Sequence, residues 1–173
     1  MPGLDAGGGE FGPDGRYYVT MRRRRTIGAI PATLGEKTGF LLPEGIVPFP
    51  RGFGFGDDGQ IYLSSGVAPS GEDANTIVLF DRSGALRTPR LVTDPELSPL
   101  DLELAPNGNI VVASEWPFGA PDAVTSVHEY DPVTGSSYGS SRPSAPSDSA
   151  GPGDGDSAAS GPASRTTSSA ASC

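Results

Sequence analysis

The stretch PLDLELAPNGNIVVASE, residues 99–115, alternates apolar and polar residues, turns at Asn107-Gly108 and then resumes an apolar run. An Asn-Gly or Asp-Gly pair between two such runs is the strongest short-range signal for a β-hairpin, because the turn needs residues that tolerate positive φ. The stretch PRGFGFGDDGQIYLSS, residues 50–65, follows the same plan with an Asp-Gly turn. Each stretch therefore predicts two antiparallel strands.

The hairpin pattern occurs three times, which indicates a repeat. Its turn glycines are Gly15, Gly59 and Gly108, at steps of 44 and 49 residues. A repeat length in the forties with strand-like content is typical of one blade of a β-propeller, a four-stranded antiparallel sheet. The third copy predicts strands at 100–105, 110–114 and 126–131; the corresponding third and fourth strands of the other copies are expected at 26–35, 37–42, 76–84 and 85–92.

The predicted fold is all-β: a partial β-propeller of about two to three four-stranded blades, with a disordered C-terminal tail. The propeller is expected over residues 11–135, after a disordered N-terminus at residues 1–10, with blades near residues 11–50, 51–98 and 99–135. The first copy has only a poor first strand, and the third copy lacks a fourth strand. Closed propellers contain roughly four to eight blades. The chain is therefore expected to be a fragment of a larger propeller; the alternative is that several chains complete one ring.

Residues 136–173 consist mainly of Ser, Ala, Gly, Pro and Thr and contain no Val, Ile, Leu, Phe, Met or Trp. Such a segment cannot bury enough apolar surface to offset the entropy of ordering it, so we expect it to be disordered. Two origins are considered. It is a natural linker, or it is a frameshift product of GC-rich DNA, in which case the alternative frame would encode an apolar-alternating strand.

The composition limits the partners and the compartment. The formal net charge of −9 argues against nucleic acid and anionic membrane surfaces, which are bound mainly through Lys and Arg. The single cysteine, Cys173, excludes an internal disulfide framework and a cysteine metal site. No signal-peptide pattern and no membrane-spanning run is visible, so a cytoplasmic location is expected. The basic run Arg22–Arg25 is interpreted as the solvated tip of a short loop; the alternative is that it binds anions or joins partner chains.

The repeat resembles NHL-repeat propellers and the related gluconolactonase-like (senescence-marker-protein-like) and streptogramin-lyase-like six-bladed propellers. The matching residues of the third copy are Pro99, Leu102, Leu104, Asn107, Gly108, Ile110, Val111, Val112, Val127, Tyr130, Asp131 and Gly135. Those of the second copy are Pro50, Phe53, Phe55, Asp58, Gly59, Ile77, Phe80, Asp81 and Gly84. These are turn and core positions, so the resemblance implies a fold rather than one function.

The sequence departs from these families at the positions that would carry chemistry. NHL repeats place an Asp just after the second strand, where this chain has Met21, Ser65 and Ser114. Metal-dependent lactonases take a ligand from an Asn after the Pro that opens the first strand, where this chain has Arg51 and Leu100. Neither residue supplies an oxygen ligand for a hard cation. The lactonase metal site is therefore not carried over to these copies.

The loops between second and third strands, at 65–75 and 115–125, are long and are expected to lie at one end of the propeller, where ligands usually bind. Trp116 and Phe118, flanked by Pro and Gly, are candidates for an aromatic ligand-binding surface. The alternative is that both aromatic side chains cap the sheet beneath them.

Asp101 and Glu115 are the candidate polar site residues, because they lie near the ends of adjacent strands. With Asp94 and Glu96 they are weak candidates for binding a divalent cation such as calcium, or for acid–base chemistry. Solvent exposure of Asp101 is the alternative interpretation. His128, the only histidine, is interpreted as a packing residue, although a streptogramin-lyase-like activity would require a catalytic histidine.

The expected function is a non-catalytic β-propeller module that binds a small molecule or a protein at its long-loop end, with self-association through open blade edges. No cofactor is evident beyond the calcium considered above. The alternative is a gluconolactonase-like, metal-dependent lactone or ester hydrolase whose catalytic blades lie outside this chain. A non-functional truncated product is the third hypothesis, which cooperative unfolding would exclude.

Overall fold

The computed structural model describes residues 6–31, 33, 39–67, 69–71 and 75–141. The chain divides into two units, residues 1–143 and residues 144–173. Residues 142–173 of the expected tail, which include the second unit, lie outside the described residues. In the described part the chain forms strands and turns, and it contains no helix long and apolar enough to cross a membrane.

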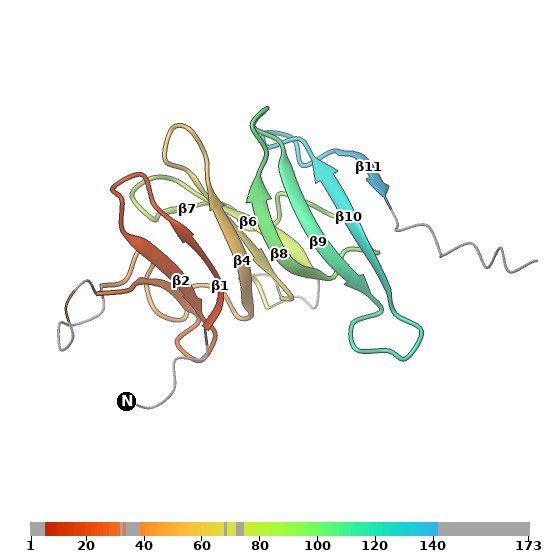
Figure 1. Cartoon of the computed structure of the whole chain (residues 1–173), viewed down its shortest axis with the longest axis horizontal. Coiled ribbons are helices and arrows are strands. Elements are labelled where there is room, and N and C mark those ends of the chain that lie inside the picture. Colours follow the sequence, from red (N-terminus) through yellow and green to blue (C-terminus); the bar gives the residue numbers. More distant parts are fainter. Residues whose placement is uncertain (1–5, 32, 34–38, 68, 72–74, 142–173) are drawn as a thin grey trace, which may run out of the picture. The chain divides into compact units, whose positions relative to one another are not determined.

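The described strands form three antiparallel sheets, which confirms an all-β partial propeller (Figure 1). The first sheet contains β1 (Ala6–Phe11), β2 (Tyr17–Met21) and β3 (Thr26–Ala29) in that order. The second contains β4 (Pro50–Phe55), β5 (Ile61–Ser65), β6 (Thr76–Phe80) and β7 (Leu86–Thr88). The third contains β8 (Pro99–Leu104), β9 (Ile110–Trp116), β10 (Val124–Tyr130) and β11 (Ser137–Ser141).

The predicted hairpin turns are confirmed. Gly15, Gly59 and Gly108 have φ values of 76°, 78° and 83°. In each turn the side chain before the glycine accepts a hydrogen bond from the backbone N–H two residues further on, a local turn-forming contact. The three bonds are Arg16 N to Asp14 (3.1 Å), Gln60 N to Asp58 (3.2 Å) and Asn109 N to Asn107 (3.0 Å).

The expected disorder of residues 1–10 is wrong for residues 6–10, which belong to β1. This strand pairs with β2 and has an irregularity between Ala6 and Gly9. Its glycines allow a close approach to the second sheet, because a Cβ on Gly8 would lie 3.1 Å from the Cα of Gly52. Because the glycine run has no side chains, this strand can pack closely against the second sheet. Residues 1–5 lie outside the described residues.

The expected tail boundary at residue 136 is also wrong, because Ser137–Ser141 forms β11, the fourth strand of the third sheet. Every residue of β11 is exposed, so apolar burial does not explain it. The turn before it is held by Asp131, which accepts hydrogen bonds from Thr134 N (2.7 Å) and Tyr138 Oη (2.9 Å). These bonds lower the pKa of Asp131 to about 2. In the first sheet, the expected strand at 37–42 is described only from residue 39, by one bridge between Gly28 and Phe40.

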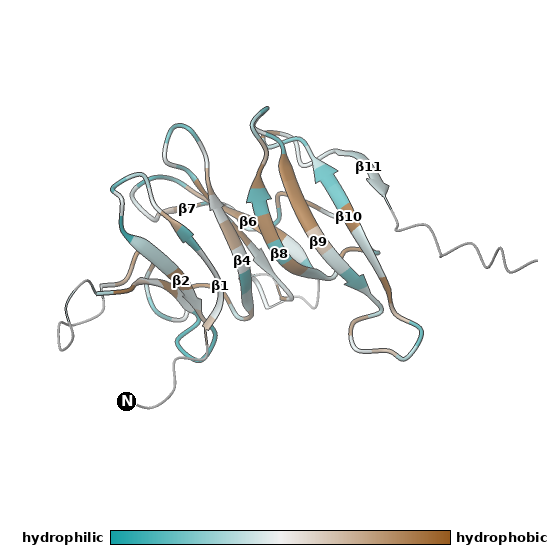
Figure 2. Cartoon of the chain, in the orientation of Figure 1, coloured by the Kyte–Doolittle hydropathy of each residue, from teal (hydrophilic) through white to brown (hydrophobic). Residues whose placement is uncertain are grey.

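Two apolar clusters form the core. One joins the first and second sheets and includes Tyr18, Ile27, Leu42, Val47, Phe53, Ile61, Leu63, Val78 and Phe80. The other joins the second and third sheets and includes Tyr62, Ile77, Leu91, Val92, Leu97, Leu102, Ile110, Val112 and Tyr130. Figure 2 shows the apolar stretch along β9, whereas β8 carries hydrophilic positions. The third sheet thus has an apolar face toward the second sheet and a more polar innermost strand.

The GFGFG segment of β4 has two different faces. Gly52 and Gly54 lie against β8, where a Cβ on Gly52 would lie 2.7 Å from the Cα of Asp101. Phe53 and Phe55 project from the other face, with ring centroids 5.7 Å apart. Period-2 alternation separates the two sets, as a strand requires. The glycines therefore set the close packing between the second and third sheets.

Candidate functional site

The loops that join second and third strands lie at the end of the sheets opposite the hairpin turns (Figure 1). They are residues 22–25 in the first sheet, 66–75 in the second and 117–123 in the third. Residues 68 and 72–74 of the second loop lie outside the described residues. This long-loop end carries the residues described next.

Arg51 makes cation–π contacts with two aromatic rings. Its guanidinium carbon lies 4.5 Å from the ring centroid of Phe49 and 4.5 Å from that of Phe118. Phe49 precedes β4 in the same sheet, whereas Phe118 comes from the β9–β10 loop of the third sheet. Each contact is within the range of a cation–π interaction, so two aromatic rings from different sheets restrict the Arg51 side chain. The predicted binding residue Phe118 therefore contacts a cation, and it does not cap its own sheet.

The surroundings of Arg51 combine charges of both signs with a buried donor that is unpaired among the described residues. The Nε atoms of Arg51 and Arg22 are buried and have no hydrogen-bond partner within the described part of the chain. Burial, and then the positive charge of Arg22, lower the pKa of Arg51, whereas the charge of Glu115 acts in the opposite direction. Arg22 and Glu115 are thus charged neighbours of Arg51. We call Arg22, Phe49, Arg51, Glu115 and Phe118 the Arg51 cluster.

The basic run of the first loop is not simply a solvated tip. Arg24 pairs with Glu44 at 3.0 Å, and Arg25 donates a hydrogen bond to the carbonyl of Gly45 at 3.2 Å. Arg22 is close enough to Arg51 to affect its pKa. The run therefore contributes one arginine to the long-loop end.

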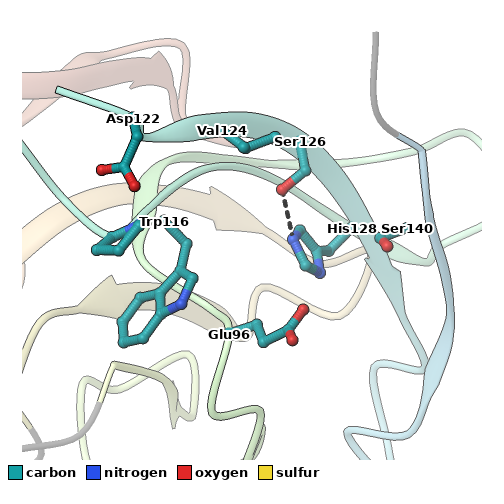
Figure 3. Close-up of a pocket in the computed structure, with 8 residues that line it drawn as sticks. Glu96, Trp116, Asp122, Val124, Ser126, His128 and Ser140 are labelled. Atoms are coloured by element: carbon teal, nitrogen blue, oxygen red, sulfur yellow. Dashed lines mark hydrogen bonds between the residues drawn. The ribbon is translucent and has the colours of Figure 1, made fainter. Parts of the chain in front are cut away.

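Trp116 belongs to a second feature, a cavity of about 140 Å³ beside β10 (Figure 3). The residues that line this cavity are Glu96, Trp116, Pro117, Asp122, Val124, Ser126, His128 and Ser140. The two predicted aromatic residues therefore belong to different sites: Phe118 contacts Arg51, and Trp116 forms part of the cavity wall.

His128 is buried, with 5% of its surface exposed, as a packing residue would be, but it has polar partners. Its Nε2 lies 2.7 Å from Ser126 Oγ, and its Nδ1 lies 3.6 Å from Asp94 Oδ2. The ring stacks on that of Tyr130 at 6.0 Å. Tyr130 Oη donates a hydrogen bond to the same Asp94 oxygen at 2.8 Å, and burial raises the pKa of this phenol.

Asp101 and Glu115 fall into different clusters. Asp101 Oδ1 accepts a hydrogen bond from Leu102 N at 3.0 Å and lies beside the inner strands. There the charges of Glu103 and Asp101 add to the effect of burial and raise the pKa of Glu10. Glu115 instead lies near Arg51. The two candidates are thus not combined into one site.

The residues present do not fit a divalent cation. The described chain contains no group of three or more His, Cys, Asp or Glu side chains arranged to hold a metal ion. At the positions where lactonases resemble this repeat, Arg51 contacts two phenylalanine rings and Leu100 is apolar.

The acidic residues on the inner strands predict a pH-dependent stability. The pKa of Glu10 is raised above its ordinary value, so ionised Glu10 opposes folding at neutral pH, and this penalty disappears as the pH falls and Glu10 is protonated. We expect Glu10→Gln to raise the melting temperature at pH 7, with the gain vanishing near about pH 4. Thermal unfolding followed by circular dichroism measures both values.

Asp14→Asn is the matched control, because hydrogen bonds from Arg16 N and then Tyr18 lower the pKa of Asp14. Its contribution to stability is present at neutral pH and is lost as the pH falls, so this variant should lower the melting temperature at pH 7. A Glu10→Gln variant that is less stable than the unchanged chain at pH 7 would contradict the predicted direction.

Comparison with known proteins identifies the fold of this chain but not its family. No protein-family model matches this chain, and no curated protein sequence matches it significantly. Among solved structures, the chain is similar to a gluconolactonase from Xanthomonas campestris, with a TM-score of 0.54 and 17% identity over 79% of this chain and 46% of that one. It is also similar to the PQQ-bound aldose sugar dehydrogenase from Streptomyces coelicolor, with a TM-score of 0.51 and 15% identity over 78% of this chain and 46% of that one.

The chain therefore has a gluconolactonase-like β-propeller fold and spans about half the length of the structures that it matches, 46% of each. At these identities the likeness concerns the fold alone, because propellers with different activities share turn and core positions.

Proposed function

We propose that this chain is a ligand-binding β-propeller module whose Arg51 cluster binds a small anionic molecule without converting it. The observation that carries the proposal is the Arg51 guanidinium, which contacts the rings of Phe49 and Phe118 and whose Nε is buried and unpaired among the described residues. A buried donor without a partner is costly, and a ligand acceptor removes that cost.

The class of ligand follows from the shape and charge of the cluster. A guanidinium presents donors in a planar fork that matches a carboxylate or a phosphate. The two rings restrict the Arg51 side chain, so little side-chain entropy is lost when the ligand binds. Arg22 adds a second positive charge, and Glu115 offsets only one of the two. Carboxylates and phosphates are thus the favoured ligands.

Binding is favoured over hydrolysis because the Arg51 cluster contains neither a nucleophile nor a set of metal ligands. The alternative function, metal-dependent lactone or ester hydrolysis, depends on ligand positions that Arg51 and Leu100 occupy in this chain. Self-association through blade edges is a separate prediction. It requires an open edge strand, and within the described residues β11 is an edge of its sheet.

Isothermal titration of the full chain with inorganic phosphate, and separately with citrate, tests the proposal. We expect saturable binding of at least one of these anions. Arg51→Gln should weaken the binding by about 10- to 100-fold, since a hydrogen bond to a charged group contributes about 1.5–3 kcal/mol. Glu115→Gln should strengthen it, because it removes the charge that opposes an anion.

Arg16→Gln is the matched control, because Arg16 lies at the hairpin-turn end and its side chain is 71% exposed. It should leave the affinity unchanged. Equal affinity in Arg51→Gln and in the unchanged chain would contradict the proposal. Lactone hydrolysis that depends on added calcium would support the alternative function.

A further inference from the structure

Ser126, His128 and Asp94 form a serine–histidine–aspartate arrangement beside the 140 Å³ cavity. Figure 3 shows Ser126 and His128 of this arrangement, joined by a hydrogen bond. Ser126 and His128 are two residues apart on β10, so a strand places both on the same side. That side carries Tyr130, which belongs to the core between the second and third sheets. Asp94 approaches from the segment between β7 and β8. The three side chains are therefore brought together by packing between two sheets.

The arrangement is held in place from both ends. Asp94 Oδ1 accepts a hydrogen bond from Glu96 N at 2.9 Å, and its Oδ2 accepts one from Tyr130 Oη at 2.8 Å. The Oδ2 atom also faces His128 Nδ1 at 3.6 Å. The His128 ring is fixed by stacking on Tyr130. These contacts leave the carboxylate and the imidazole little freedom to turn away from each other.

The positions of the two ring nitrogens define their roles. A carboxylate facing Nδ1 favours the tautomer with the proton on that nitrogen, which leaves Nε2 able to accept a proton. Ser126 Oγ lies 2.7 Å from Nε2, so its hydroxyl can donate to it. A hydroxyl hydrogen-bonded to a histidine that a third group orients is the geometry of an activated nucleophile.

We propose that Ser126 is a nucleophile for acyl transfer, with His128 as its general base and Asp94 as a positioning residue. Ser126 Oγ attacks the carbonyl carbon of an ester, forming a C–O bond, while His128 Nε2 takes the hydroxyl proton. The bond to the leaving alcohol breaks, and His128 returns the proton to that alcohol. Water, deprotonated by His128, then attacks the acyl-serine, releasing the acid and restoring Ser126. One ester and one water become one acid and one alcohol.

The cavity limits the substrate to small, uncharged esters. A cavity of about 150 Å³ in another protein holds benzene, so a similar volume here admits a short acyl or aromatic group. Trp116 and Val124 supply apolar lining, whereas Glu96 and Asp122 place carboxylates in the wall and disfavour anions. This site shares no residue with the Arg51 cluster, so it goes beyond the anion binding proposed above.

Covalent labelling of the full chain with a small alkyl fluorophosphonate tests the proposal. Attack by Ser126 Oγ would form an O–P bond and expel fluoride, while the hydroxyl proton passes to His128. We expect one adduct, mapped to Ser126 by peptide mass spectrometry, and hydrolysis of p-nitrophenyl acetate. Ser126→Ala should abolish the adduct, and His128→Gln should slow labelling by about 100-fold or more.

Ser140→Ala is the matched control, because Ser140 lines the same cavity and pairs with His128 across the strands. It should keep the adduct on Ser126. Absence of an adduct from folded, unchanged protein would overturn the proposal. So would a Ser126→Ala variant that hydrolyses p-nitrophenyl acetate at the unchanged rate while His128→Gln does not, because the imidazole would then act alone.

The role of Asp94 has its own readout. Since the chain has a single histidine, the ¹⁵N spectrum of its imidazole reports on His128 alone. We expect the unchanged chain to show protonated Nδ1 and unprotonated Nε2 in the neutral form. Asp94→Asn should shift this balance toward the other tautomer and slow fluorophosphonate labelling. An unaltered tautomer with slower labelling would show that Asp94 is merely structural and would overturn its assigned role.

Discussion

A Gly52→Val variant is expected to lose about 3 kcal/mol of stability, which is the upper part of the range for overpacking. A side chain at this position would overlap the backbone nitrogen of Leu102 and would place its Cβ 2.7 Å from the Cα of Asp101. Backbone atoms of a paired strand cannot rotate away as the end of a side chain can. The second and third sheets would therefore separate, and their shared apolar cluster would be exposed.

Urea unfolding, followed by tryptophan fluorescence of Trp116, measures this loss as a shift of the midpoint at constant slope. Gly39→Val is the control, because no atom lies within 4 Å of a Cβ built there and its φ is not in the left-handed region. It should change stability by no more than about 0.5 kcal/mol. Equal midpoints for Gly52→Val and the unchanged chain would show that β4 and β8 are not packed closely.

Phe80→Ala is expected to cost about 3–5 kcal/mol, because it removes a large aromatic side chain and leaves a cavity. Phe80 is fully buried, with 0% exposure, in the cluster that joins the first and second sheets. A domain of this size is stable by about 5–15 kcal/mol in total. Much of the protein should therefore be unfolded at temperatures that the unchanged chain tolerates.

The same urea titration, with circular dichroism as the readout, measures the effect of Phe80→Ala. Phe11→Ala is the control: Phe11 is 68% exposed and contacts Tyr17 edge to face. It should cost much less, on the order of the 0.5–1.5 kcal/mol of an aromatic pair. A loss for Phe80→Ala no greater than that for Phe11→Ala would contradict the description of the core.

The parts of the fold that depend on local chemistry could be predicted from the sequence. Each hairpin follows from a short polar side chain and a glycine at the turn, which form their contacts within a few residues. Strands β1 and β11 could not be predicted in this way. One is rich in glycine and the other is entirely exposed, so each depends on a neighbouring strand distant in the sequence or on a turn held by Asp131.

The candidate site was likewise predictable only where it depends on local sequence. Phe118 was predicted from the length and composition of its loop, and Glu115 from its place just past the end of a strand; the structure places both near Arg51. Arg51 itself was considered only as a missing metal ligand, because its contact with Phe118 joins two different sheets. His128 was interpreted as a packing residue and Ser126 was not a candidate, because Asp94 reaches them only through packing between sheets.

The hairpin turns and the longer loops lie at opposite ends of the sheets, so in this chain one end repeats the same turn chemistry and the other end differs from sheet to sheet. Each doubling of a loop costs only about 0.6 kcal/mol in closure entropy. The loops at 22–25 and 117–123 already differ in length, although both join the second and third strands of a blade. New specificities could therefore be introduced by grafting sequences into these loops, while the Asp-Gly and Asn-Gly turns continue to set the strand register.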